Sequence, residues 1–206
     1  MSNYVSFNGK QVCPSKIVCV GRNYVDHIIE LGNEIPQSPV IFMKSNSAIS
    51  SDIYTHPTDS IHYEGEISFI IVGKKIAGVG FGLDLTKRAI QSQLKQKGLP
   101  WERAKTFDRS AVFSQFVSIE DVSQISMQLH INGTLAQSSG CHCMINLPAA
   151  LIADISSFMT LETHDVVMSG TPSGVGEVHS HDEFVGSIYD GEQLLVQQRW
   201  LVKDII

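Results

Sequence analysis

Four short apolar runs, rich in Val and Ile, recur along this chain, and this recurrence constrains its fold more than any other feature. They occupy residues 16–21, 39–44, 66–73 and 165–170. β-Branched residues favour strands, and runs of four to eight residues have the length of strands rather than of helices. We therefore expect a protein organised around a β-sheet.

Two dipeptides favour tight hairpin turns. Asn132-Gly133, within residues 126–137, favours a type I′ turn between two strands, and Asp190-Gly191 gives a second hairpin signal near the C-terminus.

The first of three expected helices would have Asn23 as its N-cap and Gly32 as its stop. The three helices are expected at residues 24–31, 86–98 and 146–159. Together these elements predict an α+β fold that is mainly β.

The composition is that of an ordinary globular protein. Of the 206 residues, 43% are hydrophobic and 17% are charged, which suits one domain over residues 1–206. The formal net charge of −6 and the scattering of the 15 Lys and Arg residues argue against nucleic-acid binding, since phosphate contacts need clustered cations. Because we find no secretory signal and no apolar run near the ~18 residues that span a bilayer, we expect a cytoplasmic protein without membrane contacts.

The cysteines are expected to be reduced, as in an intracellular protein of this size. The segment Cys141-His142-Cys143 could form half of a zinc site, with His179 and His181 as the other half. Structural zinc sites usually use cysteines two to four residues apart, which makes this segment a poor match. Zinc is therefore only a minor alternative. The four cysteines are Cys13, Cys19, Cys141 and Cys143.

The most informative short segment is Glu64-Gly65-Glu66, which leads directly into an apolar run. Alternate residues of a strand face the same side, so the two carboxylates would raise each other's pKa unless a cation lies between them. Asp84, between an apolar strand and a helix, offers a third oxygen ligand. Three carboxylates select Mg²⁺, Mn²⁺ or Ca²⁺. The simpler interpretation leaves the glutamates solvated and makes Asp84 a helix cap.

An ordered set of motifs then resembles the fumarylacetoacetate hydrolase family. The set is Gly21-Arg22-Asn23-Tyr24 with His27, Glu30 and Gly32; residues 39–44; Glu64 with Glu66; Leu83-Asp84-Leu85-Thr86 with Arg88; residues 97–101 with 104–108; and residues 166–176. The segment Lys97-Gly98-Leu99-Pro100-Trp101 is similar to the short, single-domain subgroup. That subgroup includes acylpyruvate hydrolases and oxaloacetate decarboxylases.

The resemblance implies a mixed β-sandwich or roll of the type of the family's C-terminal domain, and a homodimer. It implies Mg²⁺, with Mn²⁺ or Ca²⁺ as alternatives, held by Glu64, Glu66 and Asp84. It also implies a set of catalytic residues and a set that binds the substrate, a small 2-oxo acid. The catalytic residues would be His27, Glu30 and Lys105, and the substrate-binding residues Arg22, Arg88, Gln91, Gly170 and Thr171.

The expected chemistry uses the metal as a Lewis acid. A 2,4-dioxo acid offers its carboxylate and 2-oxo oxygen as a chelate, and the metal then stabilises the enolate that leaves when the C–C bond breaks. His27 and Glu30 share a face of the expected helix, where they could activate water or be an ordinary polar surface. Lys105 could stabilise an oxyanion or bind a second carboxylate, although most lysines are simply exposed.

Hydrolysis of the C–C bond of a small 2,4-dioxo acid is the function that we expect first. The substrate would be an acylpyruvate or a compound like fumarylacetoacetate, and the products pyruvate or a related oxo acid and a carboxylic acid. The alternative is an oxaloacetate decarboxylase or an oxo-acid tautomerase that uses the same enolate. A third hypothesis is a metal-stabilised binding protein that has lost activity, against which the intact candidate residues argue.

Two departures from the family pattern bear on the site. Residues 75–82 form a shorter segment than usual, which indicates a trimmed surface loop, and Cys141 stands where a Thr four residues after Gln137 is common. The loop 170–176 lacks the Gly-Lys-Ser/Thr of a phosphate-binding loop, so we exclude nucleotide binding and expect its glycines to let the backbone approach the substrate. Among the other histidines, His62 lies near the metal motif.

Overall fold

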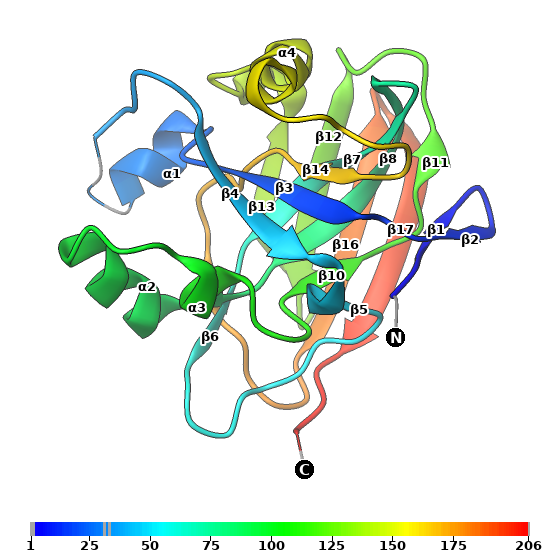
Figure 1. The fold of residues 1–206 in the computed structure, drawn as a ribbon. Helices are drawn as coiled ribbons and strands as arrows, with labels where there is room; N and C mark the ends of the chain where they lie inside the picture. Colours follow the sequence, from blue (N-terminus) through cyan, green and yellow to red (C-terminus); the bar gives the residue numbers. More distant parts are fainter. Residues whose placement is uncertain (1–2, 31, 33, 206) are drawn as a thin grey trace.

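The larger of two main sheets has eight strands and forms the centre of the molecule (Figure 1). A computed structural model describes residues 3–30, 32 and 34–205. The strand order is β4-β3-β14-β7-β8-β10-β5, with β11 also paired to β8, and the sheet is mixed because β3 with β14 and β5 with β10 are parallel. The strands are β3 (Lys16–Gly21), β4 (Val40–Ser45), β5 (Ile49–Ser50), β7 (Gly65–Val72), β8 (Lys75–Asp84), β10 (Ala111–Phe113), β11 (Val117–Ser118) and β14 (Val166–Met168).

The second main sheet is antiparallel, with the order β13-β12-β16-β17. Both predicted hairpins are confirmed in it: Asn132 and Gly133 have φ of 50° and 80°, as a type I′ turn requires, and Gly191 has φ of 55°. Its strands are β12 (Ile125–Ile131), β13 (Thr134–Gly140), β16 (Glu183–Asp190) and β17 (Gln193–Leu201). The smaller sheets contain β1 (Val5–Phe7) with β2 (Lys10–Val12), and β15 (Gly176–Glu177) with β6 (Ile61–Tyr63) and β9 (Thr86–Lys87).

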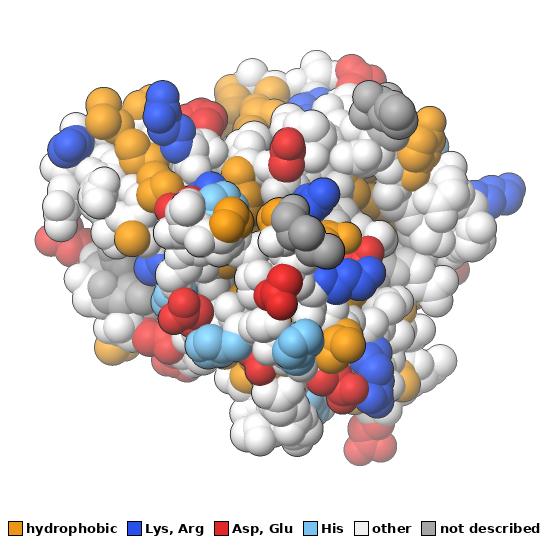
Figure 2. Space-filling view, turned by 90° about the horizontal axis from the view of Figure 1, so that it is seen from below, with side chains coloured by type: hydrophobic (Ala, Val, Ile, Leu, Met, Phe, Trp, Pro, Cys, Tyr) orange, Lys and Arg blue, Asp and Glu red, His pale blue; other side chains and the backbone are white. Residues whose placement is uncertain are grey.

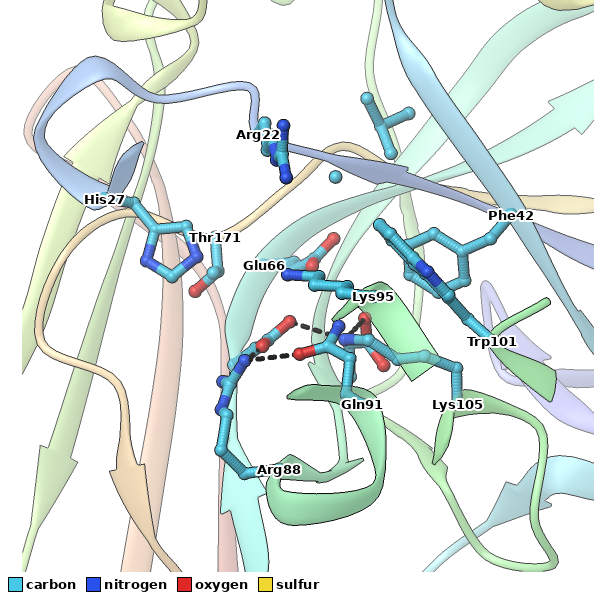
Figure 3. Close-up of a pocket in the computed structure, with 14 residues that line it drawn as sticks. Arg22, His27, Phe42, Glu66, Arg88, Gln91, Lys95, Trp101, Lys105 and Thr171 are labelled. Carbon is cyan, nitrogen blue, oxygen red and sulfur yellow. Dashed lines mark hydrogen bonds and ion pairs between the residues drawn. The ribbon is translucent and has the colours of Figure 1, made fainter. Parts of the chain in front are cut away.

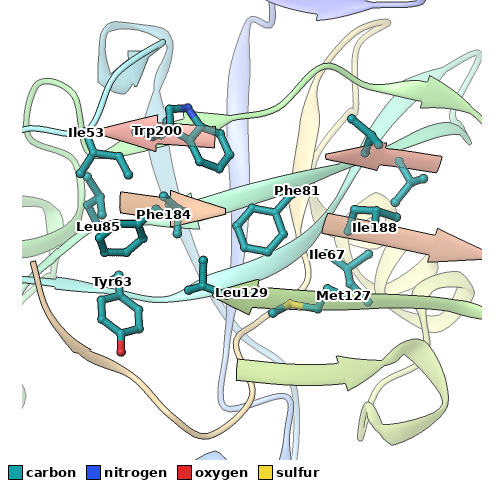
Figure 4. Close-up of a cluster of buried hydrophobic side chains, with 14 of the residues drawn as sticks. Ile53, Tyr63, Ile67, Phe81, Leu85, Met127, Leu129, Phe184, Ile188 and Trp200 are labelled. Carbon is teal, nitrogen blue, oxygen red and sulfur yellow. The ribbon is translucent and has the colours of Figure 1, made fainter. Parts of the chain in front are cut away.

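The main hydrophobic core lies between the two sheets (Figure 4). Ile67 and Phe81 of the larger sheet meet Leu129 and Trp200 of the smaller one. Strand β16 passes so close to the Phe81 ring that a Cβ at Gly186 would lie 2.4 Å from it. This two-layer packing confirms the prediction of an α+β fold that is mainly β.

The opposite face of the larger sheet is also covered. Ile155 of helix α4 (Pro148–Phe158) packs with Val18, Ile71 and Val167 of β3, β7 and β14. Strands that are buried on both faces read as continuous apolar runs rather than alternating ones. This burial explains why the sequence predicts β3, β7 and β14 to within two residues at each end. The edge strand β4 is partly exposed, and its β-branched and apolar residues predict it equally well.

The helices differ from the sequence predictions mainly at their ends. Helix α1 (Val25–Glu30) lacks the predicted cap, because the Oδ1 atom of the buried Asn23, which a cap would use, accepts the Asn146 N–H at 2.8 Å. The Asn23 amide donates to the carbonyls of Ser169 at 2.8 Å and Asn146 at 3.1 Å. The last predicted residue, 31, lies outside the described residues. The predicted helix 86–98 begins two residues late, since residues 86 and 87 form β9. The other helices are α2 (Arg88–Gln96), α3 (Glu102–Lys105), η1 (Asn46–Ala48) and η2 (Cys141–Cys143).

Residues 75–82 do not form the expected surface loop, whereas the apolar strand expected before Asp84 is confirmed. These residues belong to β8, which pairs with β7 through a two-residue turn at Gly73-Lys74, where φ is 58° and 66°. Their glycines, which weaken a strand prediction, allow close packing: a Cβ at Gly82 would lie 2.3 Å from Ser68 Oγ. Because β8 ends at Asp84, this hairpin positions one of the three carboxylates.

Figure 2 shows the face of the molecule seen from below. Lys and Arg side chains on this face are interspersed with Asp, Glu and His. The described residues visible there form no contiguous basic surface of the kind that phosphate binding requires. The absence of a nucleic-acid partner stays a prediction.

In the described parts of the chain, no helix is long and apolar enough to cross a membrane. The four cysteines are free thiols, in agreement with the prediction that they are reduced.

Candidate active site

Three carboxylates lie together where β7 and β8 run side by side. Glu64 precedes β7, Glu66 is its second residue, and Asp84 ends β8. The register pairs Gly65 with Leu83, and the Asp84 N–H donates to the Glu64 carbonyl at 2.8 Å. Each carboxylate offers an oxygen within 4.8 Å of the others. The residues are 6%, 1% and 1% exposed, which excludes the interpretation of solvated glutamates at a strand edge.

The chemistry of this carboxylate triad fits a divalent cation. Burial raises the pKa of Glu66 well above its usual range, and the charges of Asp84 and Glu64 raise it further. The Gly170 N–H donates to Glu66 at 2.8 Å and offsets this only in part. A cation between the carboxylates would relieve the repulsion, and oxygen ligands suit Mg²⁺ or Mn²⁺.

Lys105 contacts two of the three carboxylates of the triad. Its Nζ lies 2.7 Å from Glu64 Oε2, 2.7 Å from Asp84 Oδ2 and 2.6 Å from Thr86 Oγ1. Burial lowers the pKa of Lys105, but Asp84 and Glu64 outweigh burial and raise it above its usual value. The short helix α3 therefore carries a permanently charged ammonium against two of the candidate metal ligands, not an exposed lysine.

Lys44 is a site residue that the sequence analysis missed. Its fully buried ammonium lies 2.9 Å from Asp84 Oδ1 and also donates to the carbonyls of Leu85 and Lys105. A signal was present, because Lys44 ends an apolar strand, and buried lysines are rare unless they are paired. Lys44 and Lys105 together offset much of the negative charge of the triad.

Arg88 and Gln91 extend the site along helix α2. Arg88 Nη2 lies 2.5 Å from Glu64 Oε1, and its Nη1 donates to Gln91 Oε1 at 2.8 Å. Burial alone would raise the pKa of Glu64, but the charges of Lys105 and Arg88 hold it well below its usual range. Glu64 is therefore ionised, whereas the raised pKa of the neighbouring Glu66 favours its protonated form.

His27 and Glu30 form the predicted pair on α1. His27 Nδ1 lies 3.1 Å from Glu30 Oε2, and Glu30 Oε1 accepts the Gly174 N–H at 2.9 Å. Burial lowers the pKa of His27 despite the opposing charges of Glu64 and Glu30. The imidazole is therefore neutral at pH 7, with one nitrogen held by Glu30. Figure 3 shows the ring facing the cavity beside Thr171.

Gln137 joins the loop 170–176 to the carboxylate strand, a role that the sequence analysis did not assign. Its Oε1 accepts the Gly65 N–H at 2.9 Å, and its Nε2 donates to Thr171 Oγ1 at 2.9 Å and to the Pro172 carbonyl. The Thr171 hydroxyl in turn donates to the Gly65 carbonyl at 2.9 Å. Because its proton is used in this way, the hydroxyl could contact a substrate only as an acceptor.

The glycines of this loop allow close approach to neighbouring parts of the chain, and the expectation that they admit the substrate stays a prediction. A Cβ at Gly174 would lie 2.2 Å from the Ala136 carbonyl oxygen, and one at Gly170 would lie 2.9 Å from Asn23 Cβ. Both glycines also have positive φ, of 95° and 100°, which other residues rarely adopt. The Gly170 amide, predicted to bind substrate, is engaged by Glu66.

Most of the predicted site residues line one cavity (Figure 3). Glu30 and Gly170 lie behind this lining. Phe42, Lys95 and Trp101 line it without having been predicted, and the Phe42 and Trp101 rings contact each other with centroids 5.7 Å apart. The predicted residues that line the cavity are Arg22, His27, Glu64, Glu66, Asp84, Arg88, Gln91, Lys105 and Thr171.

The other candidates lie elsewhere. Within the described part of the chain, the carboxylate triad is the only group of His, Cys, Asp and Glu residues with the spacing of a metal site, so the two halves of the zinc alternative do not meet. Cys141 is buried outside the cavity lining, where burial raises its pKa to about 12. His62 lies on β6 and does not line the cavity.

Comparison with known proteins gives consistent matches. A family model described as fumarylacetoacetate (FAA) hydrolase C-terminal matches residues 16–201. The oxaloacetate tautomerase YcgM of Escherichia coli is 39% identical over 199 residues, which cover 87% of this chain and 90% of that protein. The mitochondrial oxaloacetate decarboxylase of Dictyostelium discoideum is 38% identical over 183 residues, covering 79% and 84%. Since these relatives are bacterial and mitochondrial, the cytoplasmic location stays a prediction.

A solved structure is similar over the whole chain. The fumarylpyruvate hydrolase of Pseudomonas aeruginosa, in complex with Mn²⁺ and pyruvate, has a TM-score of 0.86 and 26% sequence identity, covering 100% of this chain and 96% of that one. The match confirms the predicted type of fold.

Proposed function

The chain belongs to the fumarylacetoacetate hydrolase family of enzymes, and from this premise we propose that it is a metal-dependent tautomerase of oxaloacetate or a similar small 2-oxo acid. One observation carries the proposal: a buried carboxylate triad and a neutral His27 line the same cavity. Such a site can withdraw a proton from carbon and stabilise the resulting enolate. The name of the 39% identical relative supports this alternative at least as well as hydrolysis, the function expected first.

Glu64, Glu66 and Asp84 would hold the divalent cation. When bound there, Mg²⁺ or Mn²⁺ would supply a Lewis acid that stabilises the negative charge of the enolate. The Mn²⁺ in the similar fumarylpyruvate hydrolase supports a cation of this class. Lys105 and Lys44 would keep the ligand oxygens oriented and limit the negative charge of the cavity, so that an anionic substrate can enter.

His27 would act as the base. In the conversion of the keto form to the enol form, the C3–H bond of the oxo acid breaks and a bond from the proton to the free imidazole nitrogen forms. The same proton then passes to the 2-oxygen and completes the enol. Glu30 would hold the Nδ1–H of His27 and stabilise the imidazolium that forms in between. Arg88 and Gln91, from α2, would position the C1 carboxylate of the substrate.

Hydrolysis of a 2,4-dioxo acid is the second candidate, and the His27–Glu30 pair favours it. A water molecule in place of the C3–H would lose its proton to the same imidazole and attack the 4-carbonyl carbon. The similarity to a fumarylpyruvate hydrolase supports this candidate. Decarboxylation of oxaloacetate would need the Lewis acid but no such base.

A substrate panel with Mg²⁺ or Mn²⁺, and with excess EDTA, separates these reactions. Tautomerisation is followed by the loss of enol absorbance of oxaloacetate, and the other two reactions by release of pyruvate. The proposal predicts metal-dependent tautomerisation that is faster than pyruvate release from oxaloacetate or from acetylpyruvate. Faster pyruvate release would replace it with decarboxylation or hydrolysis. No turnover of any 2-oxo acid would favour a binding protein without activity.

A further inference from the structure

Lys95 is a cation of the cavity with no role in the chemistry above. It lies in the last turn of α2, seven residues after Arg88 and four after Gln91. Residues at this spacing share one face of a helix, and all three side chains line the cavity. Figure 3 shows the Lys95 side chain extending into the cavity from the side of Trp101. Helix α2 therefore turns a polar stripe of three side chains toward the substrate.

The environment of the Lys95 ammonium differs from that of the other cations. Lys44, Lys105 and Arg88 each lie within 2.9 Å of a carboxylate of the triad. Among the residues that the structure describes, none forms a hydrogen bond or ion pair with Lys95 Nζ, whose contact is with the Trp101 ring at 5.0 Å from its centroid. Lys95 is therefore the charged donor whose hydrogen-bonding capacity a ligand could use.

The surroundings of Lys95 suit a second anionic group. Burial, and after it the charge of Arg22, lowers the pKa of Lys95 to about 8, with smaller effects from Arg88 and Lys105, while Glu64 opposes the shift. A carboxylate beside the ammonium would compensate for this repulsion and for the lost hydration. The Phe42 and Trp101 rings contribute apolar surface to the same cavity.

We propose that Lys95 binds the distal carboxylate of a dicarboxylic 2-oxo acid and thereby selects such substrates over monocarboxylic ones. The inference rests on the proposed function, because it assumes that the C1 carboxylate and the 2-oxo group face the carboxylate triad. A four-carbon dicarboxylate then has its second carboxylate two carbons away from the 2-oxo group. Lys105, which was considered for this role from the sequence, already makes three hydrogen bonds, two to carboxylates of the triad and one to Thr86.

A purely structural role for Lys95 would give a different experimental result from a role in substrate binding. A lysine in the last turn of a helix interacts favourably with the helix dipole, and the Lys95 ammonium also lies over the Trp101 ring. Loss of these effects would lower stability and act equally on all substrates. Lys97, the exposed C-cap residue of the same helix, experiences the same dipole but does not line the cavity, so Lys97→Met is a matched control.

The test compares Lys95→Met, Lys95→Arg and Lys97→Met on oxaloacetate and on acetylpyruvate, which carries a neutral methyl group at its far end. Loss of a hydrogen bond between charged groups predicts that Lys95→Met raises KM for oxaloacetate about 10- to 100-fold, with little change for acetylpyruvate. Lys95→Arg should recover part of the loss, and Lys97→Met should behave as wild type.

A binding experiment provides a readout that is independent of turnover. Calorimetric titration with Mg²⁺ present uses malate and lactate, which are not substrates of these reactions and differ by one carboxylate. Wild type should prefer malate and Lys95→Met should lose that preference. Equal effects on both substrates, or an unchanged malate preference, would overturn the inference. If wild type turns over no 2-oxo acid, the proposed function fails, while the malate preference still decides whether Lys95 binds a carboxylate.

Discussion

The Nδ1 atom of His27 lies 3.1 Å from a carboxylate oxygen of Glu30, one helical turn away on α1. The second oxygen of Glu30 accepts the Gly174 N–H at 2.9 Å. One carboxylate therefore fixes the orientation of the imidazole and joins α1 to the loop 170–176. Because burial lowers the pKa of His27, the held imidazole is neutral and available as a base.

Replacing His27 with Ala should separate the possible reactions within one protein. Tautomerisation and C–C hydrolysis both need a base, so their kcat should fall by about 10²- to 10⁴-fold. Any decarboxylation of oxaloacetate should fall less, because the Lewis acid remains. The measurement is kcat for each reaction at saturating Mg²⁺. Equal losses in all reactions would show that His27 positions the substrate or closes the site instead.

Replacing Glu30 with Gln should give a milder form of the same pattern. The amide keeps the size of the side chain but loses the charge that stabilises an imidazolium, so we expect kcat to fall by roughly tenfold, which is less than the loss of general base catalysis itself. Glu34→Gln, at an exposed position on the same segment, is the control. A Glu30→Gln variant with wild-type kcat would reduce Glu30 to a structural link with Gly174.

The acidic limb of the pH–rate profile should report His27. Its pKa is below its ordinary value of 6.5, chiefly because of burial, so the basic form predominates at neutral pH. Activity should therefore be close to its maximum at neutral pH and should decline as the pH falls through the lowered pKa. The measurement is kcat/KM against pH at fixed free Mg²⁺. A midpoint above 6.5 would contradict the burial of a neutral imidazole.

Replacing Gly186 with Ala should destabilise the core between the sheets. The new Cβ would lie 2.4 Å from the Phe81 ring, and overpacking of this kind costs about 1–3 kcal/mol. The free energy of unfolding from denaturant titration checks this. The companion change Phe81→Leu should reduce the cost in the double variant, because it removes the clashing ring. An additive double variant would mean that Gly186 is needed for another reason.

The sequence predicts β3, β7 and β14 well because burial on both faces makes them continuously apolar. Most of strand β8 was not predicted, because its Gly78, Gly80 and Gly82 weaken a strand prediction. These glycines are required by close packing against segments that are distant in the sequence, which residue propensities do not report. Among site residues, Glu64, Glu66 and Asp84 stand out because carboxylates beside apolar strands are unusual.

Site residues whose role depends on tertiary contacts were not predicted. Gln137 lies 34 residues from Thr171 and 72 from Gly65 along the chain, and no local pattern links them. Lys44 and Lys95 had weak signals, respectively a charge at the end of an apolar strand and a position one turn after Gln91. The family resemblance predicted the roles of the carboxylates and of the His27–Glu30 pair. It did not predict which Lys and Arg side chains form ion pairs with the triad.

The triad of Glu64, Glu66 and Asp84 should bind the divalent cation on which activity depends. Glu66→Gln tests this cleanly, since the raised pKa of Glu66 makes the neutral amide a close substitute in the metal-free protein and predicts an intact fold. The measurement is calorimetric titration of Mn²⁺ into chelator-treated wild type and Glu66→Gln. We expect one site per chain and a loss of affinity of at least about tenfold in the variant, because a neutral amide is a weaker ligand than a carboxylate. Equal Mn²⁺ affinity in the two proteins would show that Glu66 does not bind the cation.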